Sequence, residues 1–304
     1  MKNTNFDYEP LLHNEEIVNA IATKPVSYWQ DAWRRLKQNR FALVSLVVIL
    51  LMVFLALVGP LLSSYTYSEQ NLEAVDQWPS TAHWFGTDGM GRDLFVRVLN
   101  GTRLSLTIGL VATFINIFIG VLYGGVSGLL GGKIDRLMMS VVEILYGIPS
   151  MIYVILLMVV LKPGLLSIYL AMGISHWLGM ARMVRGQILS LREQEFILAA
   201  RTMGASPLRI LLQHLIPNIL GIIVINITFA IPGAIFTEAF LSFIGLGVPP
   251  PMASLGTLSR EGADYIRTYT YQLIFPAMSI SIMMLAFNYL GEGLRDALDP
   301  RMRR

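Results

Sequence analysis

Long apolar runs separated by short polar segments dominate the pattern of this 304-residue chain. Five windows contain no Asp, Glu, Lys or Arg: residues 41–68, 104–132, 163–181, 210–237 and 268–291. A sixth apolar stretch, Leu137 to Leu161, is interrupted only by Glu143. A membrane-spanning helix needs about 20 predominantly apolar residues. The pattern therefore predicts an all-α membrane protein with six spanning helices, at about residues 42–62, 104–123, 137–161, 165–180, 218–244 and 272–289.

The composition supports lipid as the solvent for much of this surface. The chain is 54% hydrophobic and only 14% charged, whereas soluble proteins carry about 25% charged residues. It contains no cysteine, which excludes a disulfide framework, a thiolate metal site and a cysteine nucleophile. The polar first residues lack the apolar core of a cleavable signal peptide, so the first span is expected to direct insertion.

The distribution of basic residues predicts the orientation. With six spans and a cytoplasmic N-terminus, 17 of the 23 Lys and Arg residues fall in cytoplasmic segments. The positive-inside rule therefore places both termini in the cytoplasm. We divide the chain into a cytoplasmic tail, residues 1–40, and a transmembrane domain, residues 41–304. Within the tail, Ser27 to Arg40 has tryptophans on one face and basic residues on the other, which is typical of an interfacial helix or of a plain extension of the first span.

A polar segment at residues 190–217 reads as two short cytoplasmic helices. Ser190 and Glu193 have the spacing of a capping box, Gly204 is suited to a left-handed stop, and Ser206 before Pro207 suits the start of a second helix that Pro217 would close. Helical spacing puts one apolar set on a common face: Phe196, Ala199, Ala200 and Met203. The segment is either a docking element for a cytoplasmic partner or a simple connection. A DNA-reading helix-turn-helix is rejected because the flanking spans hold the segment at the bilayer.

The outer segment from Gly86 to Arg97 is rich in glycine and charge, which predicts a tightly folded turn. Asp93 and Arg97 are one helical turn apart and are expected to pair. A calcium loop built on Asp88 and Asp93 is disfavoured, because further acidic ligands at regular spacing are absent.

Few residues within the spans can carry chemistry. Glu143 and Glu238 are the acids expected at membrane depth, where a carboxylate lines a pathway or bonds to a neighbouring helix. The four histidines show no metal-ligand spacing, and no Walker-type phosphate loop is present. Without a paired base and nucleophile, we expect no catalytic, cofactor or metal site in this chain.

Several motifs together resemble one family. Leu198-Ala199-Ala200, Gly204 and Ile216-Pro217 fit the spacing of the signature loop of ABC-importer permeases, with Leu198, His214 and Ile216 as departures from the usual Glu, Ile and Leu. Four further stretches resemble the C-type permease subunit of oligopeptide and dipeptide importers, although Leu255 stands where that family often has Trp. They are Trp29 to Arg35, Gly86 to Asp93, Ala239 to Gly247 and Gly293 to Pro300.

The resemblance covers roughly Trp29 to Arg301 and implies a type I ABC importer permease fold in the bacterial cytoplasmic membrane. Its implied partners are a homologous B-type permease, two ATPase subunits that bind ATP and magnesium, an extracytoplasmic peptide-binding protein and lipid, with no nucleic acid. The implied ATPase-coupling residues are Phe196, Ala199, Ala200, Arg201, Met203, Gly204 and Arg209. The outer residues expected to support the binding-protein side are Gly86, Asp88, Arg92, Asp93 and Arg97.

Other functions remain open at this point. A dipeptide importer and a nickel-chelate importer use the same type of permease. A secondary transporter would need coupling-ion or proton-relay residues within its spans, and only Glu143 and Glu238 qualify. A membrane-embedded enzyme would need a catalytic pair, which the sequence does not offer.

Overall fold

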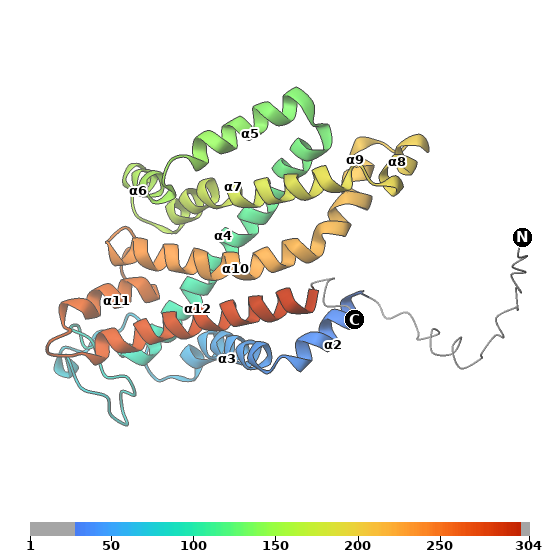
Figure 1. Ribbon diagram of the computed structural model, residues 1–304. Coiled ribbons are helices and arrows are strands. Elements are labelled where there is room, and N and C mark those ends of the chain that lie inside the picture. The colour runs from blue at the N-terminus through green and yellow to red at the C-terminus, as the bar shows by residue number, and fades with distance from the viewer. Residues whose placement is uncertain (1–27, 299–304) are drawn as a thin grey trace, which may run out of the picture.

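A computed structural model describes residues 28–298, and within that range it contains helices and no β-strand (Figure 1). Two regions that the sequence predictions cover, the tail at residues 1–27 and the basic residues after 298, lie outside the described residues. The helices in chain order are α2 (Tyr28–Gln38), α3 (Arg40–Leu62), a 3-10 helix (Leu72–Ala74), α4 (Leu94–Leu130), α5 (Gly132–Tyr146), α6 (Ser150–Leu161), α7 (Leu165–Leu191), α8 (Glu195–Thr202), α9 (Pro207–Arg209), a π-helix (Ile210–Leu215), α10 (Ile216–Phe243), α11 (Leu255–Asp264) and α12 (Tyr271–Leu298).

The expected all-α membrane architecture is present, but the count of six spans is not met in full. In the described residues four helical runs are long and apolar enough to cross a membrane, beginning at Arg40, Leu94, Pro207 and Tyr271. The pair α5 and α6 adds a fifth if it is counted as one span bent by 81°. The remaining predicted span corresponds to α7, which is long enough to cross a membrane but not apolar enough. Its 27 residues include polar and basic side chains such as His176, Arg182 and Arg185.

The longest helix, α4, begins ten residues before the predicted span. Its start is set by Asp93, whose Oδ1 accepts the N–H of Val96 at 2.9 Å as an N-cap. It ends at Gly131, which has a φ of +66°. In Figure 1 this helix runs obliquely across α7, α10 and α12, and it packs on all three. Gly124 permits the closest approach, because a side chain there would overlap the Ala181 carbonyl of α7.

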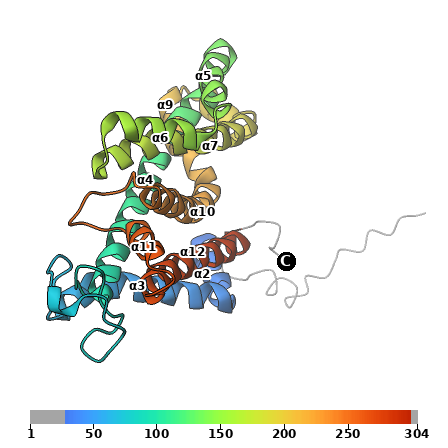
Figure 2. The same cartoon turned by 90° about the vertical axis from the view of Figure 1, so that its left-hand side faces the viewer.

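The predicted interfacial helix is α2, which packs beside α12 (Figures 1 and 2). Leu36 is buried with Ala42 and Ala297, whereas Trp29 and Trp33 are both half exposed. Asn39 separates α2 from α3 and caps the latter by accepting the N–H of Ala42 at 3.1 Å. The helix therefore has an apolar side that packs on the bundle as well as a surface of tryptophans.

Candidate functional site

The segment at residues 195–215 projects from one end of the bundle (Figure 1). Its first helix starts later than predicted: α7 continues through Ser190 to Leu191, so the expected capping box does not form and α8 begins after Gln194. Gly204 has the expected left-handed conformation, with a φ of +82°. Ser206 caps α9 as expected, accepting the N–H of Arg209 at 3.3 Å.

Two side chains of α8 anchor this segment to the bundle. Ile197 is fully buried and Ala200 is 3% exposed, and both pack with Ile188 of α7 and Leu211 and Leu215 of the π-helix. The predicted common face of Phe196, Ala199, Ala200 and Met203 is therefore wrong at Ala200, which faces the protein. Ile197 was missed because it falls outside the one set of positions that helical spacing selected.

The opposite side of the segment is exposed apolar surface. Phe196 is 44% exposed and Met203 is 81% exposed, and Ala199 is also exposed. Leu208 and Arg209 extend this surface onto α9, where Arg209 donates from Nε to Gln213 Oε1 at 2.9 Å. The remaining predicted residue, Arg201, is exposed as well. We call Phe196, Ala199, Met203 and Leu208 the coupling face.

The second helix of the segment does not close at Pro217 as predicted. The run continues through a π-helix into α10, and Ile216 donates its N–H to Leu211 O five residues back. Proline has no N–H and its ring crowds the carbonyl four residues earlier. The wider π-turn directly before Pro217 accommodates both effects, so that α9 and α10 form one continuous element.

A partly buried ion pair supports the helices beneath the segment. Asp135 of α5 accepts hydrogen bonds from Arg185 Nε at 2.5 Å and Nη2 at 2.6 Å, and from Ser127 Oγ of α4 at 2.6 Å. Because the two Arg185 bonds are bidentate, they fix the orientation of α5 on α7. Sequence reasoning overlooked Asp135, although an acid within a glycine-rich, basic turn was a usable signal.

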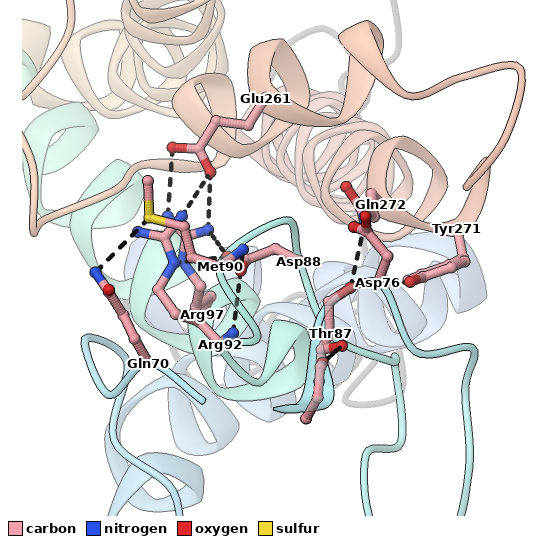
Figure 3. Close-up of polar contacts among 11 residues, drawn as sticks. Gln70, Asp76, Thr87, Asp88, Met90, Arg92, Arg97, Glu261, Tyr271 and Gln272 are labelled. Atoms are coloured by element: carbon pink, nitrogen blue, oxygen red, sulfur yellow. Dashed lines mark hydrogen bonds and ion pairs between the residues drawn. The ribbon is translucent and has the colours of Figure 1, made fainter. Parts of the chain in front are cut away.

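At the other end of the bundle lies a buried polar cluster (Figure 3). Asp88 Oδ1 accepts the N–H groups of Met90 at 2.9 Å and Arg92 at 3.0 Å, and its Oδ2 accepts Arg92 Nε at 2.7 Å and a bond from Arg97. Glu261 of α11 completes the cluster by accepting Arg97 Nη1 at 2.8 Å and Arg92 Nη2 at 3.3 Å. We call these four side chains, Asp88, Arg92, Arg97 and Glu261, the outer cluster.

The predicted pair of Asp93 and Arg97 is wrong. Asp93 already caps α4 and bonds His83 Nδ1 through Oδ2 at 2.8 Å, which leaves Arg97 to bond Asp88 and Glu261. The five predicted outer residues are all buried. They hold the outer segment in place. Gly86 has a φ of +77° and forms a turn in which the Gly86 carbonyl accepts the Leu94 N–H at 3.0 Å.

A groove of about 510 Å³ opens beside the outer cluster. Its lining includes exposed Met90 and the two prolines Pro250 and Pro251, together with Tyr265. Sequence reasoning missed Glu261, because no local spacing connects an acid on a distant short helix with the turn at Gly86. It also missed His83, although this residue lies only ten positions before its partner Asp93.

The two membrane acids have opposite environments. Glu238 of α10 is fully buried and accepts bonds from Ser105 Oγ at 2.8 Å and Ser242 Oγ at 2.7 Å. Ser105 also accepts the Leu255 N–H at 3.3 Å, so Glu238 acts as a connector of α4, α10 and α11. Glu143 of α5 is exposed. Within residues 28–298 no group of three or more His, Cys, Asp or Glu residues could hold a metal ion.

Comparison with known proteins gives consistent results along the chain. Residues 116–304 match the model of the binding-protein-dependent transport system inner membrane component family, and residues 27–79 match the N-terminal TM domain of oligopeptide transport permease C.

Individual relatives agree with these matches. The chain is 47% identical to the oligopeptide transport system permease protein OppC of Bacillus subtilis, over 98% of this chain and 97% of that protein. It is also 47% identical to the dipeptide transport system permease protein DppC of the same organism, over 94% and 90%. A solved inward-facing structure of the MetNI methionine ABC transporter covers 66% of this chain and 96% of its own, with a TM-score of 0.54 at 21% identity, which shows a shared fold.

Proposed function

The chain belongs to the family of binding-protein-dependent transport system inner membrane components, and from this premise we propose that it is the permease subunit of an ATP-driven importer of oligopeptides across the bacterial cytoplasmic membrane. A dipeptide importer is the second candidate, because a relative named for dipeptide transport is as similar, at 47%, as one named for oligopeptide transport.

The observation that carries the coupling to ATP is the two-sided packing of α8. Ile197 and Ala200 tie the helix rigidly to α7 and the π-helix, while the coupling face is left exposed. Apolar surface on a projecting element is typical of a protein interface. In our proposal two ATPase subunits, which bind ATP and magnesium, dock below the pore, and one of them receives this face in a cleft. Their closure moves α8 and shifts the pore between two states.

The remaining partners follow from the same proposal. A homologous B-type permease completes the pore, and an extracytoplasmic peptide-binding protein docks at the end that carries the outer cluster. There the buried salt bridges keep Met90 and the groove beside it in a fixed shape. Both termini are then cytoplasmic, and this chain itself catalyses no reaction.

The test is peptide-stimulated ATP hydrolysis and uptake by the reconstituted assembly, with Ala199→Asp compared to Ser190→Asp. Ala199 lies on the coupling face, whereas Ser190 is exposed at the end of α7 outside it. We expect the first change to abolish coupled uptake, because a charge at a desolvated interface is costly, and the second to leave it intact. Uptake that proceeds without ATPase subunits would contradict the proposal and indicate a secondary transporter.

A further inference from the structure

The exposed surface of α5 is divided lengthwise into two chemically different stripes. Helical spacing of three and four residues places the charged and hydroxyl side chains on one of them. This polar stripe consists of Lys133, Arg136, Ser140 and Glu143, all exposed. Beside it runs an apolar stripe whose members are 44–71% exposed: Ile134, Leu137, Val141 and Ile144. The third side of the helix, with Asp135, Met139 and Val142, is buried against the bundle.

The polar stripe reaches well into the apolar part of the chain. Glu143 lies about 16 Å along the axis from Gly132, at a helical rise of about 1.5 Å per residue. The α5–α6 pair is apolar enough to count as a bent span, and Figures 1 and 2 place it at the edge of the bundle, where its outer side is not covered by other helices of this chain. A carboxylate in contact with lipid tails costs several kcal/mol. In the described part of the chain Glu143 forms no side-chain hydrogen bond or ion pair, although its charge interacts with that of Arg185 on α7. The exposed carboxylate therefore still requires water or another polar neighbour.

The break between α5 and α6, at the end of the polar stripe, also indicates contact with water. Residues 147–150, where α5 breaks and α6 turns away by 81°, are all exposed. Pro149 offers no side-chain cap to α6, and its carbonyl accepts only the Ile152 N–H, at 2.9 Å. The N–H groups of Ser150 and Met151 therefore require partners from outside the helix. Non-helical backbone at membrane depth occurs where it is buried in protein or borders a water-filled cavity. Glu143 is one helical turn away from this break.

A basic side chain joins the same end of the stripe from α7. Arg182 is exposed and its guanidinium carbon lies 4.7 Å from the centroid of the Tyr146 ring. Tyr146 is three residues after Glu143 on α5, so this region presents both signs of charge. A peptide with free ends also carries a positive and a negative charge. As the peptide moves along the stripe, its charged ends can replace water beside these side chains, one side chain after another.

We propose that the polar stripe of α5, with Arg182 of α7, forms this chain's wall of the translocation pathway, along which zwitterionic peptides pass in contact with water. The proposal deepens the proposed function and rests on it. The apolar stripe faces lipid or an apolar surface of the partner permease. Glu238, by contrast, has no place in the pathway, because it is fully buried and bonded by two serines.

The absence of cysteine from the chain permits a direct test. Single cysteines are placed at Ser140 and Glu143 of the polar stripe and at Val141 and Ile144 of the apolar stripe. The complete complex, in membrane vesicles, is treated with a charged, water-soluble methanethiosulfonate, and modification of this chain is followed by mass. Because only water-exposed thiols ionise and react well, we expect Ser140→Cys and Glu143→Cys to react at least about tenfold faster than their neighbours. Transported peptide should slow the reaction, and modification should block uptake.

Equal reactivity at the four positions, or faster reaction at Val141→Cys and Ile144→Cys, would overturn the inference. So would cysteines on the polar stripe that react in the isolated chain but stay unreactive in the complex with and without ATP, since a partner helix then covers them. Peptide-stimulated ATP hydrolysis by the wild-type complex distinguishes failure of this inference from failure of the proposed function. If it is present and the stripe is unreactive, only this inference fails; if it is absent from the wild-type complex, the proposed function fails and the inference with it.

Discussion

Arg97 donates from Nη1 to Glu261 Oε2 at 2.8 Å, and this contact joins the first turn of α4 to α11 across 164 residues of sequence. Arg97 is only 2% exposed, and its guanidinium also bonds Asp88. The two acids are not equivalent, since the Asp88 side chain is 7% exposed and that of Glu261 is 38% exposed. The outer segment is therefore attached to the bundle mainly through Asp88. Glu261 attaches α11 to the same arginine.

This asymmetry predicts different costs for two matched changes. Asp88→Asn removes the charge that faces both arginines, and breaking a buried pair in this way costs about 3 kcal/mol or more. Glu261→Gln removes a charge at a partly solvated site and should cost about 1 kcal/mol or less. Proteolysis of the outer segment at residues 63–93 in the purified complex measures the difference. Equal protection of the two variants would show that Asp88 does not hold the segment.

Close contact between α4 and α7 predicts opposite effects of the same substitution at two glycines. Gly124→Ala places a methyl group against the Ala181 carbonyl of α7, whereas Gly179→Ala on α7 meets no atom within 4 Å. Because backbone cannot yield as a flexible side chain can, the first change should destabilise the protein by about 1–3 kcal/mol. The second should stabilise its helix by about 0.5–1 kcal/mol. Thermal unfolding of the solubilised protein measures both effects. A Gly124→Ala variant as stable as the wild type would argue against the close approach of α4 to α7.

Burial within α8 predicts that two adjacent alanines respond differently to the same charge. Ala200→Asp introduces a carboxylate beside Ile197 and Leu211, so the segment itself should detach from the bundle. Ala199→Asp should leave the fold unchanged and affect only the coupling face. Protease sensitivity within residues 192–206 of this chain reports the first effect, and ATPase binding reports the second. A protease-resistant Ala200→Asp variant would mean that this side of α8 is not packed as described.

The segment that contains these alanines shows which features the sequence could predict and which it could not. Apolar windows located nearly every long helix, and Gly204 and Ser206 marked the turn and cap in their actual places. Both signals are local, because each depends on residues within one or two turns. Spacing alone could not tell which side of α8 packs inward, since Phe196 and Ile197 are both apolar and their environments are set by α7 and the π-helix. The partner of Arg97 was likewise out of reach, because Glu261 comes near it only through tertiary packing.

The π-helix before Pro217 gives the last prediction. The Ile216 N–H reaches back five residues to Leu211 O, and the missing N–H of Pro217 favours this wide turn over a regular α-helical one. Pro217→Ala supplies that N–H, so the turn can revert to α-helical bonding, which rotates everything before it by about 100° relative to α10. The coupling face would then point away from its partner, and peptide-stimulated ATP hydrolysis should fall although the chain inserts normally.

Pro207→Ala is the matched control, because a proline in the first turn of a helix replaces no hydrogen bond. Hydrolysis that stays normal in both variants would show that the orientation of α8 does not depend on the π-helix, since Ile197 and Ala200 would then hold it unaided.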